Sequence, residues 1–308
     1  MSRVRVEEVP DPHAFLELAT PLLAADEARH NLVLGLAATL ARDPARYDEF
    51  HLWVVRDGAT VAGAALWTPP FELALARPTS VEALEALAAH LAGRGASLPG
   101  VIGADPEAGE FARSWTRRTG ATASLRMAQR IHRLTHVRPV ADVPGRMRTA
   151  MVADRDLLLD WSFAFAAEAG THADPEQLRR GVEERLAGDG EGLSAPTGYA
   201  LWEDGGRPVS LAGWAGPTPT GVRVGPVYTP PDLRRRGYAS ALVAGLSAGL
   251  LAAGRRHCFL FTDLANPTAN HIYAEIGYEP VCDAPQYAFE HAPFPVEWDE
   301  SSGTSRNS

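Results

Sequence analysis

The order of secondary-structure patterns constrains this chain most, because one succession of patterns occurs twice along its 308 residues. Each half begins with two helical patterns, continues with a β-hairpin, and then alternates strand, helix, strand, helix, strand. Asp57-Gly58 marks the hairpin turn of the first half, and Asp204-Gly205-Gly206 marks that of the second. The sequence therefore predicts the α/β class (α+β, with mixed sheets) and favours two tandem copies of one fold. A single larger α/β domain is the alternative.

The predicted elements are spread evenly over both halves. In the first half they are helices 11–24, 25–42, 81–91 and 107–119 and strands 52–55, 61–66, 71–76, 100–103 and 121–134. In the second half they are helices 154–170, 174–187, 238–254 and 268–276 and strands 198–203, 208–216, 222–229, 258–262 and 287–290. Residues 137–148 contain two prolines and a glycine, which is typical of a domain connection. We therefore predict domains at 1–137 and 138–298 and a polar, disordered tail at 299–308.

Composition argues against several classes of function. The net charge of −9 is unsuited to a nucleic-acid partner. All 29 basic residues are arginines, so no lysine can act as a nucleophile or base. The two cysteines, Cys258 and Cys282, suit neither a disulfide framework nor a zinc site, and we expect no metal. Because no signal peptide or apolar run of membrane-spanning length is present, we expect a soluble, cytoplasmic protein without a membrane partner.

The run from Gly225 to Ser240, which reads GPVYTPPDLRRRGYAS, marks a strand–loop–helix junction. Pro230-Pro231 ends the strand, because proline cannot continue the ladder of hydrogen bonds. The helix that follows begins with backbone N–H groups that have no acceptor of their own. Gly237 permits close approach to these groups, and the three preceding arginines add positive charge. The junction therefore predicts an anion site of the kind that binds pyrophosphate.

The junction resembles the phosphate loop of the GNAT acetyltransferase superfamily, whose pattern is Arg or Gln, two residues, Gly, one residue, and Gly or Ala. The residues that match this pattern are Arg234, Gly237 and Ala239. A second GNAT motif is matched downstream, in order, by Asn266, Ala269, Tyr273, Gly277 and Tyr278. The resemblance covers residues 198–290 closely and the helices of 154–187 in their general order. It implies a GNAT-like fold with acetyl-CoA as co-substrate.

The resemblance also implies roles for individual residues. The cofactor-binding residues that it implies are Val227, Thr229, Arg234, Arg235, Arg236, Gly237, Tyr238, Ala239, Asn266 and Tyr273. Tyr273 is the implied catalytic residue, because its hydroxyl can protonate the coenzyme A thiolate as it leaves. The alternative for Tyr273 is an aromatic ring that packs its helix onto the sheet. Asn266 is equally suited to cap the helix that follows it, and both roles are compatible.

The resulting hypothesis is an N-acetyltransferase in which a primary amine attacks acetyl-CoA directly in a ternary complex. We expect a small-molecule amine rather than a protein as the acceptor, without identifying it. Four residues are conceivable general bases, and the sequence does not choose among them: Asp263, Glu168, His172 and Glu203. The alternative function is a non-catalytic acyl-CoA-binding or sensing module.

The first half lacks the phosphate loop. At the corresponding place, residues 77–83 read RPTSVEA, without a glycine and without the arginine spacing. Ser80 is suited to cap the helix, but Glu82 in its first turn would repel a phosphate. We therefore predict a degenerate GNAT-like first half that does not bind coenzyme A.

Overall fold

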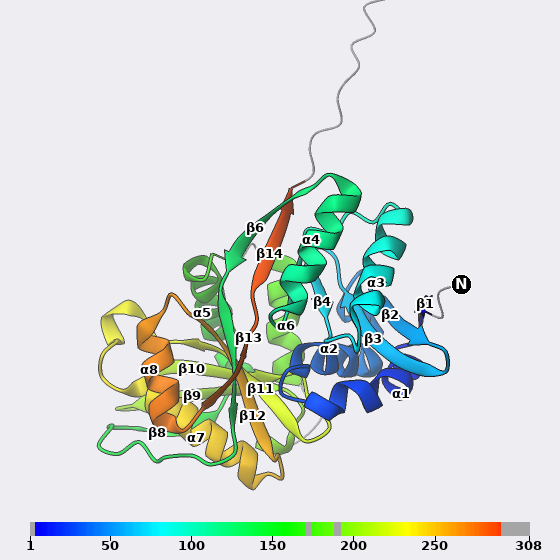
Figure 1. Ribbon diagram of the computed structural model, residues 1–308. Coiled ribbons are helices and arrows are strands. Elements are labelled where there is room, and N and C mark those ends of the chain that lie inside the picture. Colours follow the sequence, from blue (N-terminus) through cyan, green and yellow to red (C-terminus); the bar gives the residue numbers. More distant parts are fainter. Residues whose placement is uncertain (1–3, 171–173, 188–191, 291–308) are drawn as a thin grey trace, which may run out of the picture.

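The computed structural model describes residues 4–170, 174–187 and 192–290. The predicted tail at 299–308 and His172 lie outside the described residues. Two seven-stranded mixed sheets form the framework, and helices flank both of them (Figure 1). This is the predicted fold class.

The first sheet has the strand order β1-β2-β3-β4-β5-β14-β6. Its strands are β1 (Val4–Glu8), β2 (His51–Asp57), β3 (Thr60–Trp67), β4 (Leu73–Leu75), β5 (Gly100–Gly103), β14 (Gln286–Glu290) and β6 (Thr122–Met127). The second sheet has the order β13-β7-β12-β11-β10-β9-β8. Its strands are β13 (Glu279–Asp283), β7 (Gln129–Leu134), β12 (His257–Asp263), β11 (Gly221–Tyr228), β10 (Arg207–Ala215), β9 (Gly198–Asp204) and β8 (Arg146–Thr149).

Eight α-helices are present in the described ranges. They are α1 (Pro12–Leu23), α2 (Asn31–Arg42), α3 (Val81–Gly93), α4 (Glu107–Thr119), α5 (Arg155–Glu168), α6 (Pro175–Ala187), α7 (Tyr238–Ala252) and α8 (Pro267–Ile276). Their ends follow capping chemistry: Asp11 accepts a hydrogen bond at the start of α1, and Gly120 ends α4 in the left-handed conformation. No helix among these described segments has the length and apolar character needed to cross a bilayer.

The two sheets exchange a strand. In the first sheet β14, from the end of the second half, lies between β5 and β6. In the second sheet β7, from the end of the first half, lies between β12 and β13. The β6–β7 and β13–β14 connections cross at the centre of the molecule (Figure 1), where Ala284 N–H donates to the Gln129 carbonyl over 2.7 Å. The sheets therefore cross the domain boundary predicted at residue 137, while the division into 1–137 and 138–298 stays a prediction.

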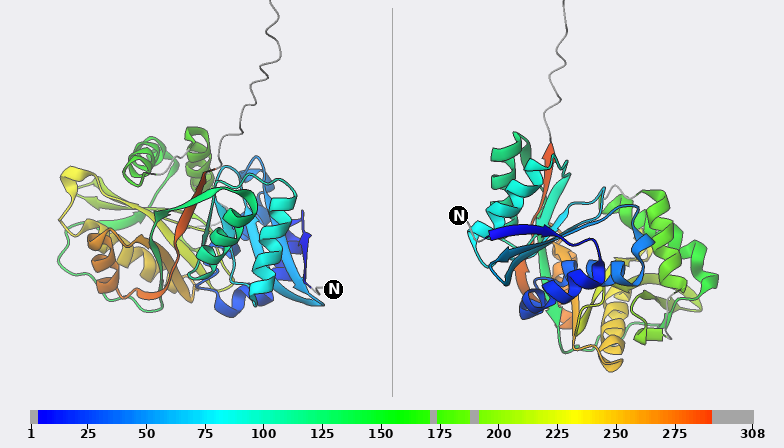
Figure 2. Two further views of the ribbon diagram at one scale, coloured as in Figure 1. Left: turned by 45° about the horizontal axis from the view of Figure 1, so that its top comes forward. Right: turned by 90° about the vertical axis from the view of Figure 1, so that its right-hand side faces the viewer.

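Each sheet has a helix pair on each face. In the second half, apolar residues of α7 and α8 pack on one face, and those of α5 and α6 pack on the other. Figure 2 shows this layering in its left view, with α5 and α6 in green above the sheet and α7 and α8 in yellow and orange below. In the first half α3 and α4 cover one face and α1 and α2 the other. We call the face of the second sheet that carries α5 and α6 the α6 face.

The first half also contacts the α6 face. Gly35 of α2 lies so close to the turn after β10 that a Cβ at Gly35 would be 2.8 Å from Gly216 Cα. Arg42 donates to Glu184 of α6 over 2.8 Å, and Arg180 of α6 donates to Asp48 over 2.9 Å. These contacts place α2 and the segment after it against α6.

Most predicted elements are observed within a few residues, but three strands were missed. These are β1, β8 and β13, each of which lies at the edge of a sheet. Edge strands carry charged residues and, in β13, Pro280, so they lack the apolar run on which the prediction relied. The predicted strand 121–134 was wrong in one respect, because it divides at Ala128 between the two sheets. The predicted helix 25–42 begins only at Asn31.

Candidate acyl-CoA and acceptor site

A slot opens in the second sheet between two parallel strands. β11 and β12 are paired only from Gly221 to Arg223, with Arg223 opposite Phe259. Beyond that point β11 remains paired with β10 as far as Tyr228, and β12 remains paired with β7 as far as Asp263. The two parallel strands therefore diverge toward their carboxyl ends, where ligands of open α/β sheets bind.

A bulge bends β11 at the start of this divergence. The register with β10 shifts between Ala212 and Trp214, so Gly213 lies inside the irregularity. A Cβ on Gly213 would be 2.9 Å from the Gly225 carbonyl oxygen, which is too close for a side chain. Gly225 itself has a φ of 146°. Glycines at both positions are thus required by the close approach and bent backbone.

The predicted phosphate loop leads directly into an uncapped helix. Gly237 is the N-cap residue of α7, with a φ of 81°, and no side chain accepts from the first turn. By contrast, Ser80 caps α3 and Asn266 caps α8 through side-chain oxygens. The first N–H groups of α7 are therefore available to an external acceptor, as an anion site requires.

The three arginines of the loop are not equivalent. Arg234 Nη2 donates to both carboxylate oxygens of Glu168, over 2.8 and 2.7 Å, and its Nε donates to the Thr229 carbonyl over 2.8 Å. Arg236 Nη2 donates to the Asp232 carbonyl at 3.3 Å, and Arg235 is exposed with a φ of 63°. The positive charge left for an anion therefore comes from Arg235 and Arg236, whereas Arg234 holds α5 to the loop.

Tyr238 and Thr229 direct their side chains into the protein. The Tyr238 ring is buried, its hydroxyl donates to Asp204 over 2.5 Å, and this hydrogen bond is the main reason that its pKa is raised. The Thr229 hydroxyl is buried against that of Ser210, at 2.9 Å. Any contact of these two residues with a ligand would therefore involve their backbone.

Asn266 and Tyr273 of the second motif lie at the start of α8 and within it. Asn266 Oδ1 accepts from Ala269 N–H over 3.0 Å, so the capping role is confirmed. Asn266 is exposed. Tyr273 is half-buried beside Tyr278, with a ring-centroid distance of 5.9 Å and edge-on geometry. Burial raises the pKa of the Tyr273 hydroxyl to about 12, so this group remains protonated at neutral pH.

The conceivable general bases that the structure describes all have partners. Glu168 is held by Arg234, as described above. Glu203 accepts from Arg148 over 2.6 Å, and Asp263 accepts from Ala265 N–H over 2.8 Å. None of the three is a free carboxylate.

Sequence reasoning missed two arginines on the α6 face. Arg223 interrupts an apolar alternation in β11, and Arg185 projects from α6. The signal for Arg223 was its position between Val222 and Val224, which pack into the α7–α8 core. Since side chains alternate across a strand, Arg223 lies on the opposite, α6 face.

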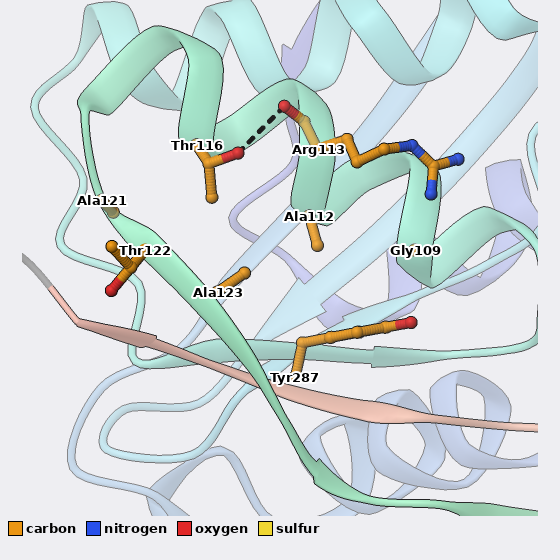
Figure 3. Close-up of a pocket in the computed structure, with 8 residues that line it drawn as sticks. All are labelled: Gly109, Ala112, Arg113, Thr116, Ala121, Thr122, Ala123 and Tyr287. Carbon is orange, nitrogen blue, oxygen red and sulfur yellow. Dashed lines mark hydrogen bonds between the residues drawn. The ribbon is translucent and has the colours of Figure 1, made fainter.

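A separate hollow of about 490 Å³ lies on the first sheet, between α4, β6 and β14 (Figure 3). Its lining includes Arg113, Thr116 and Tyr287 but no carboxylate, histidine or cysteine. It contains none of the predicted site residues. The slot in the second sheet is therefore the stronger candidate for the functional site, despite the size of this hollow.

Comparisons with known proteins bear on the family and the fold. A family model described as "FR47-like protein" matches residues 203–285, which span β10 to β13 and the slot. A search of curated proteins returned no match. Among solved structures, a tandem GNAT protein from the clavulanic acid biosynthesis pathway is 15% identical, with a TM-score of 0.57 over 94% of this chain and 99% of that chain. This chain has a tandem GNAT fold.

Two further solved structures are similar to this chain over almost its whole length. A GNAT-family acetyltransferase from Colwellia psychrerythraea is 12% identical, with a TM-score of 0.55 over 93% of this chain and 100% of that chain. A Drosophila protein is also 12% identical, with a TM-score of 0.65 over 92% of this chain and 98% of that chain. At these identities the likeness concerns the fold.

Proposed function

We propose that the protein is an N-acetyltransferase that transfers the acetyl group of acetyl-CoA to a primary amine in a ternary complex. The observation that carries this proposal is the divergence of β11 from β12 beside the uncapped start of α7. We further propose a small-molecule acceptor and a cytoplasmic location, with neither a nucleic acid nor a metal taking part. The net charge of −9 supports the exclusion of nucleic acid.

The residues around the slot fit the chemical groups of acetyl-CoA. Backbone N–H groups at Gly237, Tyr238 and Ala239 would bind the pyrophosphate, with Arg235 and Arg236 supplying charge. The backbone of Val227 lies in the diverging part of β11, where an extended amide-bearing chain would pair with it. Thr229 and the Asn266 amide nitrogen would bind further along the same chain. Arg234 would act by positioning the loop.

Acetyl-CoA supplies an acetyl thioester and a thiolate leaving group. A backbone N–H of the diverging β11 segment would stabilise negative charge on the acetyl oxygen. The acceptor nitrogen forms the new bond to the acetyl carbon, the carbon–sulfur bond breaks, and the amine proton passes to water. The Tyr273 hydroxyl then donates its proton to the sulfur, and solvent restores it. The raised pKa of Tyr273 keeps this proton available at neutral pH.

The test is release of free thiol from acetyl-CoA across a panel of primary amines, with the acetylated product identified by mass. We expect release that depends on both acetyl-CoA and the amine. Tight acetyl-CoA binding without thiol release across the panel would reject the enzyme in favour of an acyl-CoA-binding or sensing module. One observation favours that second candidate: Glu168, Glu203 and Asp263 are all engaged by other groups.

A further inference from the structure

Two arginines on the α6 face lack the carboxylate partners that their neighbours have. Arg42 and Arg46 share Glu184, and Arg180 binds Asp48. Within the residues that the structure describes, Arg223 and Arg185 form no ion pair. Since an uncompensated guanidinium in a protein interior is costly, this pair requires an explanation.

Arg223 is half-buried at the base of the slot. It is the last β11 residue paired with β12, and its Nη1 is shielded from solvent without a hydrogen-bond partner in the described chain. A Cβ on Gly216 would lie 3.1 Å from its Nη2, which places the guanidinium against the turn after β10. Burial lowers the pKa of Arg223 to about 10. Tyr47 acts in the opposite direction and raises this pKa, whereas the positive charge of Arg185 lowers it further. The group is therefore still charged at neutral pH.

Arg185 reaches the same region from α6. Its Nη1 donates to the Tyr199 hydroxyl over 2.9 Å, and its guanidinium stacks over the Tyr199 ring at 4.9 Å. A Cβ on Gly213 would lie 3.1 Å from this Nη1 and 2.9 Å from the Gly225 carbonyl oxygen. Arg185 is thus positioned at the bulge, where β11 begins to diverge.

The two guanidinium groups repel each other, and no carboxylate of the described residues forms an ion pair with either of them. An anion bound between them would receive charge-assisted hydrogen bonds and offset both charges. Building on the proposed acetyl transfer, we propose that the acceptor amine carries a carboxylate, which Arg223 and Arg185 bind on the α6 face. The carboxylate would hold the amine beside the diverging strands, on the side of the sheet away from α7.

The first experiment compares matched acceptors with the full-length protein. Thiol release from saturating acetyl-CoA is measured for the common L-amino acids and β-alanine, each against its carboxamide. We expect kcat/KM for the best acid to exceed that of its carboxamide by about 30-fold, because a buried charged hydrogen bond is lost in the amide. Equal use of acid and carboxamide would reject the carboxylate site and leave acetyl transfer intact.

The second experiment uses Arg223→Met and Arg185→Met, with Arg180→Met as the control from the same helix. Arg180 is half-buried and already forms an ion pair with Asp48, so it is a control arginine whose charge is not left for a ligand. We expect each test variant to lose about 50-fold in kcat/KM for the acid, with the carboxamide within about threefold and acetyl-CoA affinity unchanged. The control retains the preference for the acid.

Thermal unfolding separates a binding role from a structural one. The acid should raise the Tm of the wild type above that given by its carboxamide, and should not do so in Arg223→Met. Without ligand, Arg223→Met should unfold at or above the wild-type Tm, because it removes a half-buried charge that has no ion-pair partner among the described residues. A fall of several degrees in that variant would show that Arg223 is structural and overturn the proposal. Should acids raise the Tm while no amine releases thiol, the carboxylate site would stand and acetyl transfer would be wrong.

Discussion

The junction between β4 and α3 in the first half corresponds to that between β11 and α7 in the second half, and the two differ in three ways. All three residues of β4 are paired with β5, whereas β11 leaves β12 after its third residue. The chain after β4 is bonded back to β3, with Ala76 N–H donating to Ala64 and Thr79 N–H donating to Ala62. In the second half, the loop after β11 leads away from the sheet into an uncapped helix. The same architecture thus gives a closed junction after β4, where the strands stay paired, and an open junction after β11, where they diverge.

The closed junction shows what the fold does without a ligand site. Ser80 Oγ accepts from Ala83 N–H over 3.2 Å, and Glu82 places a negative charge in the first turn of α3. Both satisfy the positive end of the helix from within the protein. At α7 the same end is left to Gly237 and to arginines. The comparison supports the proposal that only the second half binds acetyl-CoA.

The largest effect is expected from a substitution that blocks the phosphate loop at the open junction. Gly237→Glu should abolish acetyl-CoA binding, with a loss of at least about 100-fold in affinity by calorimetry. The carboxylate repels phosphate, and a Cβ at this residue would lie 2.8 Å from Val143 Cγ2 at a φ of 81°. Gly254→Glu is the matched control, since it has a positive φ at the other end of α7 with open space around it. Retained affinity in a folded Gly237→Glu protein would contradict the assignment.

Removing the Tyr273 hydroxyl should have the next largest effect, which is on kcat. Tyr273→Phe is expected to lower kcat by about 10- to 100-fold while KM for acetyl-CoA changes little, because the hydroxyl acts on the leaving sulfur. With a pKa of about 12, the hydroxyl stays protonated as pH rises. Wild-type kcat should therefore show no fall between about pH 8 and 10. A steady-state pH profile checks this, and an unchanged kcat in the variant would assign Tyr273 to packing.

The three loop arginines should contribute unequally to acetyl-CoA affinity. Replacing Arg235 and Arg236 together by glutamine is expected to weaken acetyl-CoA binding about tenfold, and less at high salt. Arg234→Gln should weaken it less, because Arg234 is already held by Glu168. Titrations at two salt concentrations measure both effects. A larger loss for Arg234 would mean that its ion pair opens when the ligand binds.

The smallest effect tests the first half. Ser80→Ala removes the cap of α3 and should lower the free energy of unfolding by about 1 kcal/mol. Because β4 and β5 remain paired, the variant should gain no second acetyl-CoA site, and calorimetry should give the wild-type stoichiometry. A second bound equivalent would show that capping alone distinguishes the two junctions.

The sequence predicted local features better than pairings. Helix caps such as Asn266 and the loop before α7 depend on neighbouring residues, so their patterns are visible along the chain. The partners of a carboxylate depend on contacts distant in sequence, and Glu168 was therefore a conceivable base until Arg234 was found beside it. Arg223 and Arg185 were missed for the same reason. The exchange of β7 and β14 could not be predicted, because either sheet would accept a strand of this length at that position.

The strand exchange has a consequence for how the chain is made. β14 lies between β5 and β6. When only the first half of the chain has left the ribosome, β5 and β6 therefore lack the strand that joins them. The second sheet has a similar gap that only β7 fills, and β7 belongs to the earlier part of the chain. The arrangement is that of a strand-swapped pair joined into one polypeptide. The second sheet can therefore be completed once β13 has been made, and the first sheet only once β14 has been made.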